Sequence, residues 1–135
     1  MQQRRIIGNY KTVSFPEFGI SDTKAKIDTG AETGALHSTN IRLITKDNKQ
    51  HLTFSPFDHP EITYSTTDYY QDEVKSSNGM TEKRYYITTN IQIDKETLPI
   101  TLSLTNRESM KYPVLIGVKF LAKYKYIVDL SITDA

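Results

Sequence analysis

Alternation of apolar and polar residues constrains the fold of this chain more than any other feature. In 87–93 the isoleucines share one face of an extended segment, and in 98–104 the leucines and one isoleucine do the same. Successive side chains of a strand point to opposite faces, so both segments are predicted to be half-buried β-strands. Asp94-Lys95-Glu96 lies between them and predicts a hairpin turn.

Strands are expected over most of the remaining chain as well. Residues 124–130 and 51–57 favour two more strands, the second of which ends at a proline. Helix is expected only at 117–123 and at 106–110. The fold class is therefore all-β. The segment 38–70 is expected to decorate the main sheet, and its role stays open.

Asn78-Gly79 predicts a second hairpin. This pair favours a type I′ turn, because both central residues of that turn need a positive φ. The arms would be about 71–77 and 80–87, and both are polar and charged. Such a hairpin is expected to project from the fold. It would either have a functional role or be a surface hairpin without a function.

Composition narrows the classes of protein. The 135 residues predict a single domain over 1–135. No apolar run approaches the roughly 20 residues of a membrane-spanning helix, and no apolar stretch follows the N-terminal arginines, so neither a membrane partner nor a signal peptide is expected. A cytoplasmic location is the default. The lack of cysteine excludes disulfides and thiol catalysis, and a net charge of +1 gives no footprint for nucleic acid.

Two short blocks carry the candidate chemistry. Asp28-Thr29-Gly30-Ala31 follows a short alternating segment, and Pro113-Val114-Leu115-Ile116-Gly117 comes near the C-terminus. An acid in a tight turn at a strand end, followed later by two aliphatic residues and a glycine, is the pattern of one aspartic-peptidase lobe. Taken alone, Asp28 is more simply an ordinary turn residue or a helix N-cap. Both blocks in this order favour the peptidase lobe.

Residues 24–37 and 98–117 resemble the retropepsin-like family often labelled "ATP-dependent zinc protease", which is associated with ATP-grasp enzymes that ligate glutamate. Its members carry an Asp-Thr-Gly-Ala block ending in Ala-Leu-His, then Leu-Thr-Asn-Arg, then a Pro-x-Leu-aliphatic-Gly block. The resemblance runs from about residue 7 to about residue 130. It implies a single-lobe, retropepsin-like closed β-barrel with a flap hairpin and one short C-terminal helix. The flap would be the hairpin around Asn78-Gly79.

The resemblance implies catalytic roles for Asp28, Thr29 and Gly30. Aspartic-peptidase chemistry needs two carboxylates about 3 Å apart that share one proton. This chain has one such block, so the expected enzyme is a homodimer in which each subunit contributes one Asp28. Thr29 would form a hydrogen bond across the two-fold axis, the N–H of Gly30 would point at Asp28, and residues 115–117 would pack beneath the loop.

Five further residues are candidates for substrate binding: Ala31, His37, Asn78, Gly79 and Arg107. His37 would either touch the substrate or support the loop as a buried structural histidine. Arg107 would bind a substrate carboxylate in bidentate fashion or form a structural ion pair. Against the family pattern, Glu32 stands where a basic residue is typical, Gly34 where serine is common and Val118 where arginine is usual.

Neither a cofactor nor a metal site is expected, despite the family label. The chain has three histidines, His37, His51 and His59, but neither a His-Glu-x-x-His motif nor a cysteine. It also has no glycine-rich phosphate loop that would bind ATP.

Two functions remain open. The first is an aspartic endopeptidase that acts on a peptide or protein substrate, with glutamyl-tailed or acidic peptides suggested by the association of the family with glutamate ligation. The second is a non-catalytic β-barrel module that binds a peptide or partner in the same cleft. A metal-dependent hydrolase is a weaker third.

Overall fold

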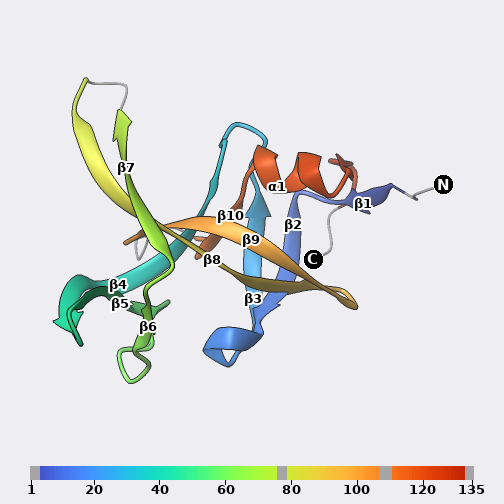
Figure 1. Ribbon diagram of the computed structural model, residues 1–135. Coiled ribbons are helices and arrows are strands. Elements are labelled where there is room, and N and C mark those ends of the chain that lie inside the picture. Colours follow the sequence, from blue (N-terminus) through green and yellow to red (C-terminus); the bar gives the residue numbers. More distant parts are fainter. Residues whose placement is uncertain (1–3, 76–78, 107–110, 133–135) are drawn as a thin grey trace.

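Strands dominate the protein, as predicted (Figure 1). The computed structural model describes residues 4–75, 79–106 and 111–132. The strands are β1 (Arg5–Ile7), β2 (Tyr10–Phe15), β3 (Ile20–Ile27), β4 (Gly34–Lys46), β5 (Lys49–Pro56), β6 (Tyr64–Thr66), β7 (Tyr69–Lys75), β8 (Thr81–Ile93), β9 (Glu96–Thr105), β10 (Val114–Ile116) and β11 (Tyr126–Val128), and the helices are the 3-10 helix η1 (Pro16–Phe18) and α1 (Val118–Lys123). Neither of these helices has the length and the apolar run that would let it cross a membrane.

Six strands pair in a ring. Strand β10 runs parallel to β3 and antiparallel to β4, which closes the order β10-β3-β2-β8-β9-β4 back onto β10. Two contacts of the ring are short: β2 and β8 pair only at Val13↔Ile93 and Ser14↔Gln92, and β10 and β4 pair only at two positions as well. The largest fully buried apolar side chains come from these strands and from β5: Val13, Phe15, Leu36, Leu52, Phe54, Ile87, Ile91, Ile93, Leu102, Val114 and Ile116.

The alternating segments form the hairpin that the sequence predicts. Strands β8 and β9 pair from Tyr85↔Leu104 to Ile93↔Glu96, so Asp94 and Lys95 form the turn. Asp94 takes a positive φ of 56°, which aspartate tolerates better than most residues. The isoleucines of 87–93 are buried, as are all the apolar residues of 98–104 except the half-buried Leu98.

The predicted hairpin around Asn78-Gly79 is present, and the register of its arms differs from the one that a two-residue turn would give, while Asn78 itself lies outside the described residues. Strands β7 and β8 pair from Tyr69↔Ile87 to Lys75↔Thr81. This register leaves an odd number of residues, 76–80, between the paired ends, whereas a two-residue type I′ turn at 78–79 would pair 75 with 82. Gly79 has a φ of +86°, which suits the left-handed position of a longer hairpin loop. The hairpin stands away from the ring (Figure 1).

The α-helix found among the described residues, α1, lies where the sequence predicts it, whereas the strand after it is shorter than predicted. Helix α1 ends at Lys123, and Lys125 reverses the chain with a φ of +59°. Strand β11 can therefore start only at Tyr126, where it pairs in parallel with β1. The other predicted helical segment, 106–110, falls almost wholly outside the described residues, and Asn106 itself is not helical.

The segment 38–70 extends the sheet beyond the ring. Strand β4 pairs with β9 and β10 at its start and with β5 along the rest, and β6 adds one more strand at the edge of β5. An aromatic cluster holds this extension against the core, and it consists of Phe15, Phe18, Phe54, Phe57 and Tyr64 with ring centroids 4.9–5.9 Å apart. These rings were not foreseen as the anchor of the segment.

Candidate functional site

Asp28 lies in a tight turn at the end of β3, beside β10. The backbone N–H of Asp28 donates to the carbonyl of Ile116 at 2.9 Å, which continues the parallel pairing of the two strands. The N–H of Gly30 donates to Oδ1 of Asp28 at 2.9 Å, and the N–H of Ala31 donates to the backbone carbonyl of Asp28 at 3.3 Å. The hydrogen bond from Gly30 therefore fixes Oδ1 of the Asp28 carboxylate, whereas Oδ2 takes no part in this turn.

The Asp28 turn lies at the surface of the single chain. Asp28 is half-buried, whereas Thr29 and Gly30 are exposed. This chain supplies one carboxylate at the turn, and a mechanism with two paired aspartates needs the same turn from a second chain. The exposure of Thr29 leaves its side chain accessible to such a partner.

Glycines allow β10 and α1 to come close to the Asp28 loop. A methyl group at Gly117 would lie 2.8 Å from the carbonyl oxygen of Ala31, and one at Gly34 would overlap the carbonyl oxygen of Leu115. The N–H of Val118 then donates to Ala31 at 2.8 Å and that of Lys119 to Glu32 at 3.0 Å. Residues 115–117 thus pack beneath the Asp28 loop. The lack of a side chain at Gly34 allows β10 to approach the start of β4 closely.

An exposed ion pair joins the loop to α1. The Nζ of Lys119 lies 3.1 Å from Oε1 of Glu32, and the two side chains are 69% and 77% exposed. The hydrogen bond to Glu32, followed by its negative charge, raises the pKa of Lys119. Glu32 stands where the family pattern has a basic residue, and its charge is compensated by Lys119 in the first turn of α1.

His37 lies inside the protein. Its side chain is 2% exposed, and its Nε2 lies 2.7 Å from Oδ1 of the exposed Asp58. Its backbone N–H donates to Pro113 at 2.7 Å and its carbonyl accepts the N–H of Phe57 at 2.8 Å. His37 therefore joins β4 to the residue before β10 and to the turn after β5, which favours the supporting role over direct contact with a substrate.

The other candidate substrate-binding residues fare differently. Ala31 is half-buried and its carbonyl holds the first turn of α1. Gly79 is exposed near the tip of the β7–β8 hairpin. Asn78 and Arg107 lie outside the described residues. Among the described residues, no three His, Cys, Asp or Glu side chains gather in a way that could hold a metal ion.

The hairpin carries a ladder of tyrosines that the sequence reasoning missed. Tyr70 and Tyr86 pair across the two strands and stack with ring centroids 4.8 Å apart at 4°, while Tyr69 and Tyr85 meet edge to face. The Tyr70 side of the hairpin faces the loop, since Tyr70 lines the same pocket as Thr33 and Lys119. The repeated Tyr-Tyr dipeptide in both arms was the available signal.

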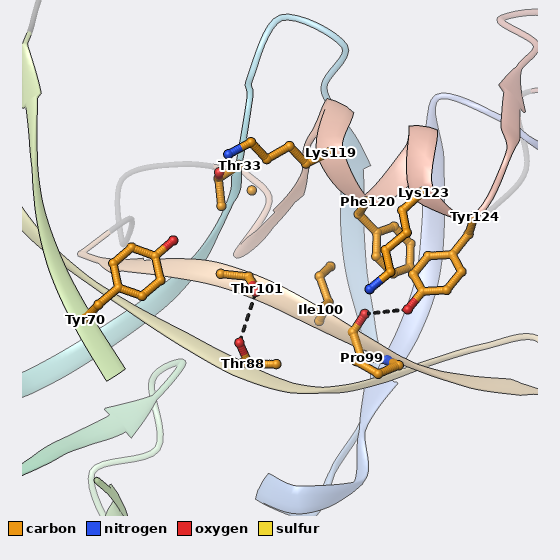
Figure 2. A pocket seen from close by; sticks show the side chains of 11 residues that line it. Thr33, Tyr70, Thr88, Pro99, Ile100, Thr101, Lys119, Phe120, Lys123 and Tyr124 are labelled. Atoms are coloured by element: carbon orange, nitrogen blue, oxygen red, sulfur yellow. Dashed lines mark hydrogen bonds between the residues drawn. The ribbon is translucent and has the colours of Figure 1, made fainter. Parts of the chain in front are cut away.

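A pocket of about 240 Å³ opens between this hairpin, β9 and α1 (Figure 2). Figure 2 shows Tyr70 at one end, Lys123 and Tyr124 at the other, and the threonines Thr88 and Thr101 between them. The pocket is lined by Thr33, Gly34, Tyr70, Thr88, Pro99, Ile100, Thr101, Lys119, Phe120, Lys123 and Tyr124. Asp28 does not line it, although Thr33 ends the same loop and Gly34 begins β4 directly after it.

Comparisons with known proteins show which family and which chains this protein resembles. A model of the RimB-like family, described as "Retropepsin-like aspartic endopeptidase RimB", matches residues 6–134. The chain is 35% identical over 133 residues to a probable alpha-L-glutamate ligase of Shewanella pealeana, and 35% identical over 121 residues to a protein of the same name from Desulfotalea psychrophila. These matches cover 93% and 84% of this chain but 28% and 26% of the relatives, so the chain spans about a quarter of their length.

The fold has a solved counterpart as well. A crystal structure of a protein of unknown function from Legionella pneumophila matches with a TM-score of 0.75 and 29% sequence identity, over 97% of each chain.

Proposed function

Because this chain belongs to the RimB-like family of retropepsin-like aspartic endopeptidases, we propose that it hydrolyses peptide bonds as a homodimer with one Asp28 from each subunit at the active site. The observation that carries the proposal is the Asp28 turn. Its carboxylate is held by the N–H of Gly30 at 2.9 Å, at the end of a strand that β10 supports, and the turn is open at the surface.

The proposed mechanism uses two Asp28 carboxylates that share one proton. Like charges about 3 Å apart cannot both ionise, so one pKa rises and the other falls. The ionised carboxylate takes a proton from water, and the oxygen of that water attacks the scissile carbonyl carbon. The protonated carboxylate donates its proton to the carbonyl oxygen. Collapse of the tetrahedral intermediate breaks the C–N bond. The carboxyl group that took a proton from water gives it to the leaving nitrogen, and a hydroxyl of the intermediate returns a proton to the other carboxylate.

We propose an acidic or glutamyl-tailed peptide as the substrate. The relatives named as probable glutamate ligases contain a segment similar to this chain, and a peptidase beside a ligase would act on the bond that the ligase makes. The ion pair between Glu32 and Lys119 supports this choice, because it lowers the repulsion that Glu32 alone would exert on an acidic chain.

The test is hydrolysis by the purified protein of a synthetic peptide that ends in several glutamates. Asp28→Asn keeps the shape of the side chain and should lower kcat at least about 100-fold. Asp22→Asn is the matched control on the same strand, since Asp22 has a φ of 57° that asparagine also adopts. Full activity in the Asp28→Asn protein would refute the proposal.

Mixing the subunits tests the homodimer. If wild-type and Asp28→Asn chains exchange freely at equal amounts, half of the wild-type chains pair with an inactive partner. The activity should then fall to about half of that of the same amount of wild type alone. Activity that does not change on mixing, with exchange verified by labelled subunits, would show that one chain is sufficient.

A non-catalytic binding module is the second candidate function. The favouring observation is the pocket beside α1, which Asp28 does not line. The relative named as a probable glutamate ligase contains a segment similar to this chain. In this second proposal, such a segment binds the substrate of the ligase without cutting it. Tight binding of the glutamate-tailed peptide without any hydrolysis by the dimer would favour this function.

A further inference from the structure

The pocket between the β7–β8 hairpin and α1 has a built interior of its own. Its floor is apolar, because two of its lining residues are Ile100 and Phe120. Both are buried, with 3% and 7% exposure. Two aromatic rings stand at its ends, Tyr70 from the hairpin and Tyr124 from the end of α1 (Figure 2). A volume of about 240 Å³ matches one large side chain rather than a long peptide.

Polar groups converge on one part of this pocket. The hydroxyl groups of Thr88 and Thr101 lie 3.0 Å apart, so one donates to the other, and the acceptor keeps its own hydrogen for a further bond. The hydroxyl of Tyr124 donates to the carbonyl oxygen of Pro99 at 3.3 Å. These hydroxyls make the pocket wall polar above an apolar floor, which is the usual composition of a site for a small ligand.

The two lysines of the pocket differ in their partners. Lys119 is engaged by Glu32 at 3.1 Å. Lys123 lies one helical turn further on, and it forms no ion pair with any carboxylate of the described residues within 4.0 Å. Its Nζ lies 5.4 Å from the centroid of the Tyr124 ring, and Figure 2 shows the amine turned toward Pro99 at the pocket. A positive charge therefore stands at this end of the cavity without a negative one among its lining residues.

We propose that this pocket binds a carboxylate carried on an apolar body, as in the C-terminal residue of a polypeptide that ends in a large apolar side chain. The carboxylate would pair with Lys123, and the apolar side chain would cover Ile100 and Phe120. This inference goes beyond the proposed peptidase function and needs no chemistry at Asp28. It assigns a binding role to residues of α1 and β9.

Occupation of the pocket would join two elements that the peptidase also uses. Thr33 ends the loop that begins at Asp28, Gly34 begins β4, and Tyr70 belongs to the hairpin. A ligand between them contacts both at once. Binding should therefore perturb the amide signals of the loop and of β7, and not only those of α1.

The experiment is a titration of the full-length ¹⁵N-labelled protein, followed by amide chemical shifts. The probes are N-acetyl-phenylalanine, its C-terminal amide, a tetrapeptide ending in phenylalanine and the amide of that tetrapeptide. The two acids should bind with a dissociation constant on the order of 1 mM or below and shift the amides of Gly34, Thr101 and α1. Equal affinity for acid and amide would overturn the proposal.

Charge variants identify the lysine. Lys123→Gln should weaken binding about threefold, and Lys123→Glu should weaken it about tenfold. Lys46→Glu, at the far β4–β5 hairpin, is the matched control and should bind as wild type does. A well-dispersed spectrum verifies that each variant is folded. Unchanged affinity in Lys123→Glu would refute the assignment, as would shifts confined to residues away from the pocket.

The source of the carboxylate follows from the same data. A tetrapeptide that binds more tightly than N-acetyl-phenylalanine indicates a polypeptide end, and equal affinity indicates that a small apolar acid suffices. Because all these measurements are of binding, they stand even if the Asp28→Asn experiment finds no peptidase activity. The two proposals therefore fail separately.

Discussion

The backbone N–H of Gly30 donates to Oδ1 of Asp28 at 2.9 Å, within the turn that ends β3. This bond is made inside one chain, so it orients the carboxylate before any partner arrives. A hydrogen bond to the ionised form of a carboxylate stabilises that form. The turn thus orients one Asp28 carboxylate within a single chain. In the proposed dimer, the second carboxylate is Asp28 of the other subunit.

Gly30→Ala tests how closely this orientation must be kept. A methyl group at Gly30 would lie 3.3 Å from Oδ1 of Asp28, so the carboxylate must move by a few tenths of an ångström. We expect kcat on the glutamate-tailed peptide to fall about tenfold, with little change in the urea midpoint of unfolding. If kcat is unchanged while the protein stays folded, the position of Oδ1 does not govern the reaction.

Gly117→Ala tests the packing beneath the loop. The added methyl group would lie 2.8–2.9 Å from backbone atoms of Ala31, Thr33 and Gly34, and backbone cannot move aside as a flexible side chain does. The free energy of unfolding should fall by about 2 kcal/mol, measured by urea denaturation.

Gly19→Asn is the contrasting variant for Gly117→Ala. Gly19 has a φ of +68° and open space around it, and asparagine adopts such a φ more readily than most residues. It should cost less than about 1 kcal/mol. A loss for Gly117→Ala no larger than that for Gly19→Asn would contradict the close approach seen here.

The sequence predicted the elements that depend on local pattern. The β8–β9 hairpin follows from the alternation in 87–104, and α1 follows from the short segment after Gly117. The Asp28 turn and its support by residues 115–117 are likewise where the two motif blocks place them. In each case the local residue pattern favours the structure that is found, and the contacts with distant segments are consistent with it.

What could not be predicted depends on contacts between distant segments. In the β7–β8 hairpin Tyr70 pairs with Tyr86 and Lys75 with Thr81, a register that a two-residue turn at 78–79 would not give. Strand β4 passes from β9 to β5 between His37 and Ser38, and a bulge between Thr39 and Arg42, where Asn40 has a φ of 54°, then shifts its register with β5. The pocket exists only because α1, β9 and the hairpin meet. None of these follows from residue spacing.

Glu17→Ala tests a polar hub between η1, β8 and β6. The Oε1 of Glu17 accepts hydrogen bonds from Thr89 Oγ1 at 3.2 Å and from the backbone and side-chain nitrogens of Asn90 at 3.0 and 2.9 Å, while Oε2 accepts from Tyr64 at 3.1 Å. Thr89 is 2% exposed, so its hydroxyl would lose the hydrogen bond to Glu17 inside the protein. We expect unfolding to become easier by about 2–3 kcal/mol.

The partner variant of Glu17→Ala is Glu17→Gln. It keeps an accepting oxygen at this position, so it should lose about half as much stability as the alanine variant. Both losses are measured by urea unfolding with circular dichroism. Equal losses for alanine and glutamine would show that the charge matters and the geometry does not.

The pH dependence of stability tests the ion pair between Arg5 of β1 and Glu96 of β9. The guanidinium of Arg5 donates to both carboxylate oxygens of Glu96 at 2.9 and 2.6 Å and lies over the rings of Tyr124 and Tyr126. The hydrogen bond from Arg5 lowers the pKa of Glu96 below its ordinary value of 4.5. The folded protein therefore binds the proton of Glu96 less readily than the unfolded chain does.

It follows that the stability from this pair is fully present above the ordinary pKa of glutamate and is lost as the pH falls through the lowered pKa. Glu96→Gln should therefore be less stable than wild type at pH 7, and the difference should shrink as the pH falls below about 4.5. Urea unfolding of both proteins at pH 7 and at pH 3 measures it. Glu73→Gln is the control, since Glu73 is exposed and forms no ion pair within the described residues, so this variant should stay close to wild type in stability. A difference between wild type and Glu96→Gln that stays constant across this range would show that Arg5 does not hold Glu96 in solution.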